Sequence, residues 1–204
     1  MSSRLSRHSR LSTSSQTPDQ KRLSSPPTHR KTPLNQEIYK YFRIGDANMN
    51  GSLDHEELCY VLKNDRNTNF KPETCRILIS MFDSDGDLVI DPYEFESLWG
   101  YLTKWRGIFS QIDKDNSHTI SRSELKRAFQ ILGYKFSDSF LQMVLNKFGN
   151  QTGNLQTLNF DDFVRLNCII NNLTVKFAQR DGQRSGHVLM GYEEFMHMVF
   201  ESIM

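Results

Sequence analysis

Apolar residues recur at steps of three and four along most of the chain after residue 35, and this spacing predicts amphipathic helices. The longest regular stretch joins two acidic segments. Its apolar positions are Phe95, Leu98, Trp99, Leu102, Trp105, Ile108 and Phe109. A second long stretch has apolar positions at Phe163, Leu166, Ile169, Ile170, Leu173 and Phe177. We therefore predict an all-α protein in which two long helices each connect two neighbouring polar segments.

Shorter helices are predicted around these two, and several have recognisable ends. Pro72 suits the first turn of a helix that runs to Phe82. Gly133 suits the end of a helix that begins near Ser121, and Ser137 suits the cap of the next helix. The last helix is apolar at Phe195, Met198, Val199 and Ile203.

Three polar segments of twelve residues each begin with aspartate and end with glutamate. Oxygen-bearing side chains stand at the first, third, fifth, ninth and twelfth places, and the seventh place can offer a backbone carbonyl. This is how an EF-hand loop presents oxygen ligands to Ca²⁺. The candidate ligands are Asp46, Asn48, Asn50, Ser52, Asp54 and Glu57 in the first loop, Asp83, Asp85, Asp87, Val89, Asp91 and Glu94 in the second, and Asp113, Asp115, Ser117, Thr119, Ser121 and Glu124 in the third.

The sixth place of such a loop needs a left-handed backbone, and the three loops differ there. The first loop has Gly51, so it fits the template throughout, and its alternative is a capped surface turn. The second has Leu88, which costs about 1–2 kcal/mol in that conformation, while Gly86 stands two places earlier. For this loop Ca²⁺, Mg²⁺ and an empty, distorted loop all stay open. The third has His118, and we expect it to bind Ca²⁺ with His118 as a strained turn residue and not a ligand.

Two further segments keep the helix–loop–helix pattern without the ligands. The fourth begins at Gly149, is about two residues too long, and keeps the apolar anchors Leu158 and Phe163. The fifth has Ala178 and Arg180 where acids are expected, so it is predicted to be a hand in shape only. EF-hands pair their loops through a short β-bridge, so a fifth hand lacks a partner within its own chain. A second chain is the simplest partner.

Charge divides the chain of 204 residues unequally. Residues 1–37 hold seven Lys/Arg against two acids, a net charge of +5, and the remainder carries −4. Residues 1–34 are rich in Ser, Arg and Pro, and we expect them to be disordered because they cannot bury enough apolar surface. This tail is either a simple solvated segment, a regulatory segment phosphorylated near Ser24 and Ser25, or a transit peptide. Residues 35–204 are expected to form the folded domain.

Other function classes find little support in the sequence. There is no run of about 18 apolar residues for a membrane span and no apolar core for a secretory signal at the N-terminus. No nucleophile–base motif, phosphate loop or zinc spacing occurs, so we expect no enzyme, and we expect no nucleic-acid binding. Cys59, Cys75 and Cys168 suit buried free thiols in a reducing compartment, which predicts a cytoplasmic protein.

Three stretches together resemble the penta-EF-hand family. They are FESLWGYLTKWRGIFSQIDKDNS from residue 95, SRSELKRAFQILGYKFSDSF from residue 121 and FAQRDGQRSGHVLMGYEEFMHMVF from residue 177. The resemblance covers about residues 38–204. It implies eight helices, Ca²⁺ in the first three hands, and dimerisation through the fifth hand as a homodimer or as a heterodimer with another penta-EF-hand chain. The Ser/Arg-rich tail departs from the Gly/Pro-rich tails of many relatives, so their tail-dependent membrane behaviour is not carried over.

The function expected from these features is that of a calcium sensor and adaptor. Ca²⁺ neutralises clustered carboxylates, reorients helices and exposes apolar surface, which then engages protein partners or associates reversibly with membranes. Two alternatives stay open. One is the regulatory small subunit of a calpain-like protease, and the other is a passive calcium buffer.

Overall fold

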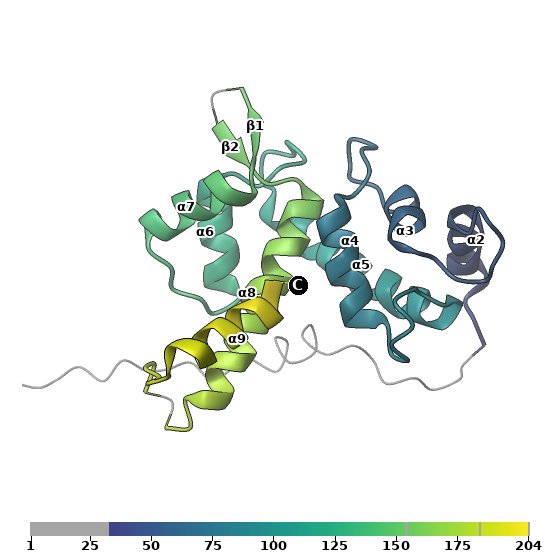
Figure 1. Ribbon diagram of the computed structural model, residues 1–204. Coiled ribbons are helices and arrows are strands. Elements are labelled where there is room, and N and C mark those ends of the chain that lie inside the picture. The colour runs from purple at the N-terminus through teal and green to yellow at the C-terminus, as the bar shows by residue number, and fades with distance from the viewer. Residues whose placement is uncertain (1–32, 154, 184, 204) are drawn as a thin grey trace, which may run out of the picture.

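The computed structural model describes residues 33–153, 155–183 and 185–203, and this part of the protein contains eight helices and one short β-hairpin (Figure 1). The helices are α2 (Gln36–Gly45), α3 (His55–Val61), α4 (Pro72–Phe82), α5 (Pro92–Ile112), α6 (Arg122–Ile131), α7 (Asp138–Phe148), α8 (Phe160–Arg180) and α9 (Tyr192–Ile203). The hairpin pairs β1 (Asn150–Thr152) with β2 (Leu155–Thr157). The prediction of an all-α protein with eight helices is confirmed. Of the predicted disordered tail, residues 1–32 lie outside the described residues.

The helices form five helix–loop–helix units because two of them serve twice. Helix α5 is the outgoing helix of the second unit and the incoming helix of the third, and α8 has the same two roles in the fourth and fifth units. Each of these helices has 21 residues, which confirms the two long shared helices. The helices that follow the first three loops begin at capping boxes, in which the ninth residue of the loop caps the helix and the twelfth bonds back to it. These N-caps are Asp54, Asp91 and Ser121.

Short β-bridges pair the loops. Leu53 and Ile90 exchange two backbone hydrogen bonds of 2.9 Å, and Ile120 and Leu158 exchange bonds of 2.7 and 3.0 Å. All four side chains are fully buried, so each bridge also anchors its loops in the core. The first hand is thus paired with the second and the third with the fourth, as expected. The fifth loop has no such bridge within the described residues.

Helix α5 connects the two halves of the core. Near its start, the ring of Phe95 packs edge-on against Phe42 of α2, with centroids 5.7 Å apart. Further along, Trp105 and Phe109 pack against Phe163 of α8, at 5.7 and 5.6 Å. The apolar face predicted for this helix is therefore buried on both sides of the molecule, while α4 lies beside α8 in the middle (Figure 1).

The connection between α3 and α4 is more than a polar linker. Lys63 and Asn69 form an isolated bridge that folds the segment back on itself. Phe70 is buried and packs against Phe160 at the start of α8, with ring centroids 5.9 Å apart. The linker thus brings the first half of the chain into contact with the fourth hand.

The described residues also bear on the cysteines and on membrane spans. Cys59, Cys75 and Cys168 are all buried and free, as predicted. No described helix combines the length and apolar character that crossing a bilayer requires.

Candidate metal centres

The first residue of each predicted calcium loop caps the incoming helix, and its carboxylate closes the loop. In all three loops one carboxylate oxygen of the first residue accepts the N–H of the sixth. These bonds join Gly51 to Asp46 (3.2 Å), Leu88 to Asp83 (2.9 Å) and His118 to Asp113 (3.0 Å). The loops are therefore built alike despite their different sixth residues.

The last glutamate of each loop bonds to both ends of the loop. One of its oxygens accepts the N–H of the second residue, and the other accepts the N–H of the ninth. The distances are 3.1 and 3.3 Å for Glu57, 2.7 and 3.0 Å for Glu94, and 2.8 and 2.9 Å for Glu124. Each glutamate, which belongs to the outgoing helix, is thus held against the start of its loop, where the first aspartate also lies.

Carboxylates converge in the second and third loops. Asp83, Asp85 and Asp87 each place one oxygen within 4.8 Å of the others. In the third loop Asp113, Asp115 and Glu124 meet the same limit. Oxygen atoms gathered in this way are the ligands that Ca²⁺ prefers.

The first loop has three carboxylates at ligand places, as the third loop does, and one of its ligand atoms is unsatisfied. Asp46 is buried, and no donor among the described residues reaches its Oδ1 atom. A buried carboxylate oxygen without a partner is costly, and a cation held by this loop would supply that partner. Asn48 and Asn50 point their side-chain oxygens at N–H groups of the loop, at 2.9 Å each. The residues of all three loops fit a calcium ion, with Ser52, Val89 and Thr119 at the place that offers a backbone carbonyl.

The ninth-place residues Asp54, Asp91 and Ser121 have a second role. Each is the N-cap of the outgoing helix, and the two aspartates accept N–H bonds of 2.7–2.9 Å from its first turn. An oxygen engaged in this way suits the ninth place, which often reaches the ion through water.

The backbone of these loops is left-handed at two places, not one. The fourth and sixth residues both have positive φ: Met49 and Gly51 (57° and 86°), Gly86 and Leu88 (82° and 66°), and Asn116 and His118 (53° and 59°). Leu88 thus adopts the strained conformation expected of it, with its side chain 76% exposed. Gly86, which the sequence placed two residues early, meets the requirement of the fourth place.

Leu88→Gly is expected to stabilise the protein by about 1 kcal/mol and to raise the affinity of the second loop about fivefold. The substitution removes backbone strain and loses little packing, because Leu88 is mostly exposed. Thermal unfolding and calorimetric titration with Ca²⁺ would measure both effects. Gly51→Leu is the reverse control: a Cβ at Gly51 meets nothing within 4 Å, so strain alone should weaken the first loop. Equal Ca²⁺ affinities before and after either substitution would show that backbone strain at the sixth place does not affect binding.

Charge repulsion distinguishes the second loop from the third. The N–H of Asp87 lowers the pKa of Asp85, but desolvation and the neighbouring carboxylates outweigh that bond, so the pKa of Asp85 lies above its ordinary value. In the third loop the hydroxyl and N–H of Ser117 hold the pKa of Asp115 below its ordinary value. A cation bound at the second loop would therefore relieve repulsion at Asp85.

The fifth loop begins at Asp181, so the sequence alignment that put Ala178 and Arg180 at the acid positions was wrong. Helix α8 continues to Arg180, which shifts the start of the loop towards the C-terminus. Asp181 accepts N–H bonds from Ser185 (2.8 Å) and from Gly186 (2.7 Å) at the sixth place, where φ is 77°. The first half of this loop thus resembles the calcium loops, although its last acid, Glu194, comes two residues late.

The last acid separates the five hands into two groups. In the fourth hand Asp162 pairs with Lys71 at 2.6 Å, and in the fifth Glu194 pairs with Arg180 at 2.9 Å. Within the described part of the chain, no lysine or arginine pairs with the last glutamate of the first three hands. In the two hands for which no metal was predicted, a lysine or arginine side chain thus already lies against the last acid.

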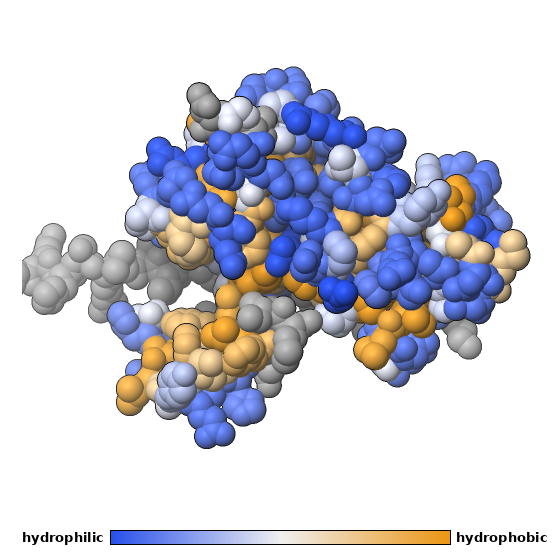
Figure 2. Space-filling view, turned by 45° about the horizontal axis from the view of Figure 1, so that its top comes forward, coloured by the Kyte–Doolittle hydropathy of each residue, from blue (hydrophilic) through white to orange (hydrophobic). Residues whose placement is uncertain are grey.

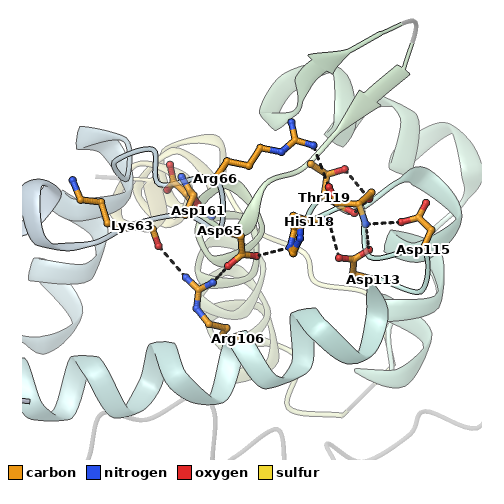
Figure 3. A network of polar contacts seen from close by, with 11 residues as sticks. Lys63, Asp65, Arg66, Arg106, Asp113, Asp115, His118, Thr119 and Asp161 are labelled. Atoms are coloured by element: carbon orange, nitrogen blue, oxygen red, sulfur yellow. Dashed lines mark hydrogen bonds and ion pairs between the residues drawn. The ribbon is translucent and has the colours of Figure 1, made fainter. Parts of the chain in front are cut away.

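The sequence did not reveal a polar network between the linker and the third loop (Figure 3). Asp65 forms an ion pair with Arg106 of α5, and its other oxygen lies 3.7 Å from Nδ1 of His118. Arg66 donates to the carbonyl of Ser117 at 3.1 Å. His118, expected to be only a turn residue, therefore has an acidic neighbour from the first half of the chain. These partners are 41 to 53 positions apart, so no local pattern indicates them.

Known proteins share both the sequence pattern and the fold. The family model described as an EF-hand domain pair matches residues 35–100 and 102–166. A homolog of programmed cell death 6 protein from Leishmania major superposes with a TM-score of 0.68, covering 89% of this chain and 98% of that chain. At 24% identity this likeness concerns the fold.

Among relatives, the peflin of Danio rerio is 31% identical over 171 residues, which are 84% of this chain and 63% of that protein. Human peflin is 31% identical over 162 residues, or 79% and 57%. The chain thus spans less than two thirds of these peflins. The probable calcium-binding protein CML48 of Arabidopsis thaliana is 32% identical over 89% of this chain and 78% of its own length. Together with the five helix–loop–helix units, these similarities show that the chain is a calcium-binding EF-hand protein of the penta-EF-hand family.

Proposed function

We propose that this protein is a calcium sensor and adaptor that changes conformation when its first three loops fill and then engages protein partners. One observation carries the proposal. The first three hands leave their last glutamate without a basic partner in the described residues, whereas the last two hands pair theirs with Lys71 and Arg180. Three sites are thus open to a cation, and two are closed by the chain itself.

The glutamates link metal binding to helix position. Each lies on the outgoing helix and is hydrogen-bonded to the second residue of its loop, so a change at the carboxylate changes the angle between two helices. Bound at these oxygens, Ca²⁺ supplies the charge that offsets repulsion among the carboxylates. Because α5 joins the second and third loops, a rotation at one of them is transmitted to the other.

The fifth hand supports association with a second chain. Its loop lacks a bridge partner in the described residues, and four large apolar side chains around α9 are exposed. They are Leu189, Tyr192, Phe195 and Phe200. Figure 2 shows apolar surface over the α9 region, at the lower left. We propose that a second penta-EF-hand chain, either another copy or a related protein, packs against this surface. A calpain-like large subunit would use the same surface.

Three measurements on one preparation test the proposal. Calorimetric titration is expected to find three Ca²⁺ per chain. An apolar dye should fluoresce more strongly when Ca²⁺ is present. Light scattering should report a dimer that Phe195→Asp converts into a monomer. Binding without any change in dye fluorescence would instead identify a passive buffer, and a monomeric wild type would refute pairing through the fifth hand.

A further inference from the structure

Lys71, the residue just before α4, reaches into the fourth hand. Its Nζ atom lies 2.6 Å from Oδ1 of Asp162 and 3.3 Å from Oδ1 of Asn150. The amide of Asn150 in turn donates to the other oxygen of Asp162. The Asp162 side chain is fully buried, whereas that of Lys71 is 36% exposed. The three side chains form a closed polar triangle whose only cation is the lysine.

The position of this triangle corresponds to that of the metal-binding carboxylate in the other hands. Asp162 is the last acid of the fourth hand, and Asn150 is the second residue of its loop. In the first three hands the last glutamate likewise contacts the second residue, through a backbone N–H. The lysine, however, comes from outside the hand, 91 residues earlier in the chain. It brings positive charge to the place where the first three hands are open to a metal ion.

The backbone around Lys71 makes a second attachment to the start of α8. The N–H of Lys71 donates to Asp161 at 2.8 Å, and the N–H of Asp161 donates to the side chain of Asn64 at 2.9 Å. Asp161 is fully buried, and this burial raises its pKa to about 6 despite the hydrogen bond from Lys71. Both ends of the linker between the first and second hands are thus fastened to the first turn of α8.

Helix α4 connects the attachment at Lys71 with the second calcium loop. Lys71 precedes its first residue, and Asp83, the first ligand of the second loop, follows its last residue. Helix α8 begins at the same attachment and ends at the fifth hand. Helix α4 is therefore a single rigid element between the second loop and the start of the helix that carries the fifth hand.

We propose that Lys71 acts as a built-in cation for the fourth hand and, through that contact, makes the second calcium loop and α8 move together. This inference extends the proposed sensor function, because it names the contact that carries a calcium signal from the first half of the chain to the second. Breaking a buried ion pair on one side leaves an uncompensated charge, which is strongly destabilising.

The first experiment measures thermal unfolding without Ca²⁺. Lys71→Met is expected to lower Tm by on the order of 10 °C, and adding Asp162→Asn should recover at least half of that loss because no unpaired charge remains. Lys126→Met is the matched control, since Lys126 pairs with Asp138 at 3.0 Å on the exposed surface. It should change Tm by no more than about 2 °C. The proposal is overturned if the Tm of the Lys71→Met protein equals that of the Lys126→Met control. It is also overturned if adding Asp162→Asn does not restore the Tm.

The second experiment follows the signal by amide hydrogen exchange. In a background with Glu57→Gln and Glu124→Gln, Ca²⁺ binds chiefly to the second loop. Ca²⁺ is then expected to slow exchange in the first turns of α8 about tenfold, and not to slow it once Lys71→Met and Asp162→Asn are added. An unchanged response in that variant would refute the coupling. If Ca²⁺ binds to the wild type but not to this background, the second loop carries no signal and the coupling is refuted. If the wild type binds no Ca²⁺ either, the sensor function fails, whereas the unfolding experiment still decides the role of the lysine.

Discussion

Glu124→Gln is expected to weaken Ca²⁺ binding at the third loop by on the order of 100-fold. The substitution keeps the size of the side chain but replaces one oxygen by an amide and removes the charge. In this loop Glu124 converges with Asp113 and Asp115, so its carboxylate contributes directly to the ligand set. It also holds the outgoing helix α6 to the start of the loop through the N–H of Lys114. Both the affinity and the conformational response should therefore fall.

Calorimetric titration with Ca²⁺ would show this as the loss of one of three sites in the accessible concentration range. Glu194→Gln is the matched control, because that glutamate closes the fifth hand and is paired with Arg180 at 2.9 Å. We expect the control to retain three sites. If both variants bind as the wild type does, the last acid does not distinguish the hands, and the assignment of three open sites is incorrect.

Phe109→Ala is expected to destabilise the protein by about 3–5 kcal/mol, the usual cost of removing a buried phenylalanine ring. Phe109 is 1% exposed and packs edge-on against Phe160 and Phe163 of α8, at 5.5 and 5.6 Å. Its carbonyl also accepts the N–H of Asp113, the first ligand of the third loop. The cavity would thus weaken the contact between α5 and α8 directly beside a candidate metal centre.

Differential scanning calorimetry is the appropriate measurement, and a decrease in Tm of about 10 °C is expected for a chain of this size. Met143→Ala on α7 provides the comparison, because Met143 is half exposed and its removal leaves no buried cavity. Ca²⁺ should raise the Tm of the Phe109→Ala protein as long as the loops still bind. Equal unfolding temperatures for the two variants would show that the α5–α8 contact contributes little to the stability of the fold.

Local features were predictable because they depend on residues close together in sequence. The three candidate calcium loops were proposed from oxygen-bearing residues at fixed places, and the starts of α4 and α7 follow from Pro72 and Ser137. The strain at Leu88 also followed from its place in the loop. The fifth loop was misplaced because the sequence contains no stop signal at Gln179 or Arg180, so the end of α8 could not be located within one turn.

The contacts between the two halves could not be predicted in the same way. Asp65 and Arg106 are 41 residues apart, and Lys71 and Asp162 are 91 apart. In the sequence Lys71 is one surface lysine among many, and the linker that carries it is simply polar. Phe70 was the only local indication that this linker packs against something.

The sequence by itself determined the helices, the paired hands and the residues able to hold Ca²⁺, because periodicity and ligand spacing are properties of short segments. Only the tertiary structure showed what the last acids of the other two hands bind instead. The sequence indicated that these two hands lack ligands, and folding brings Lys71 and Arg180 against Asp162 and Glu194. Whether a carboxylate is free for a metal ion depends on every charge that the fold places within a few ångströms of it, and those charges come from distant parts of the chain.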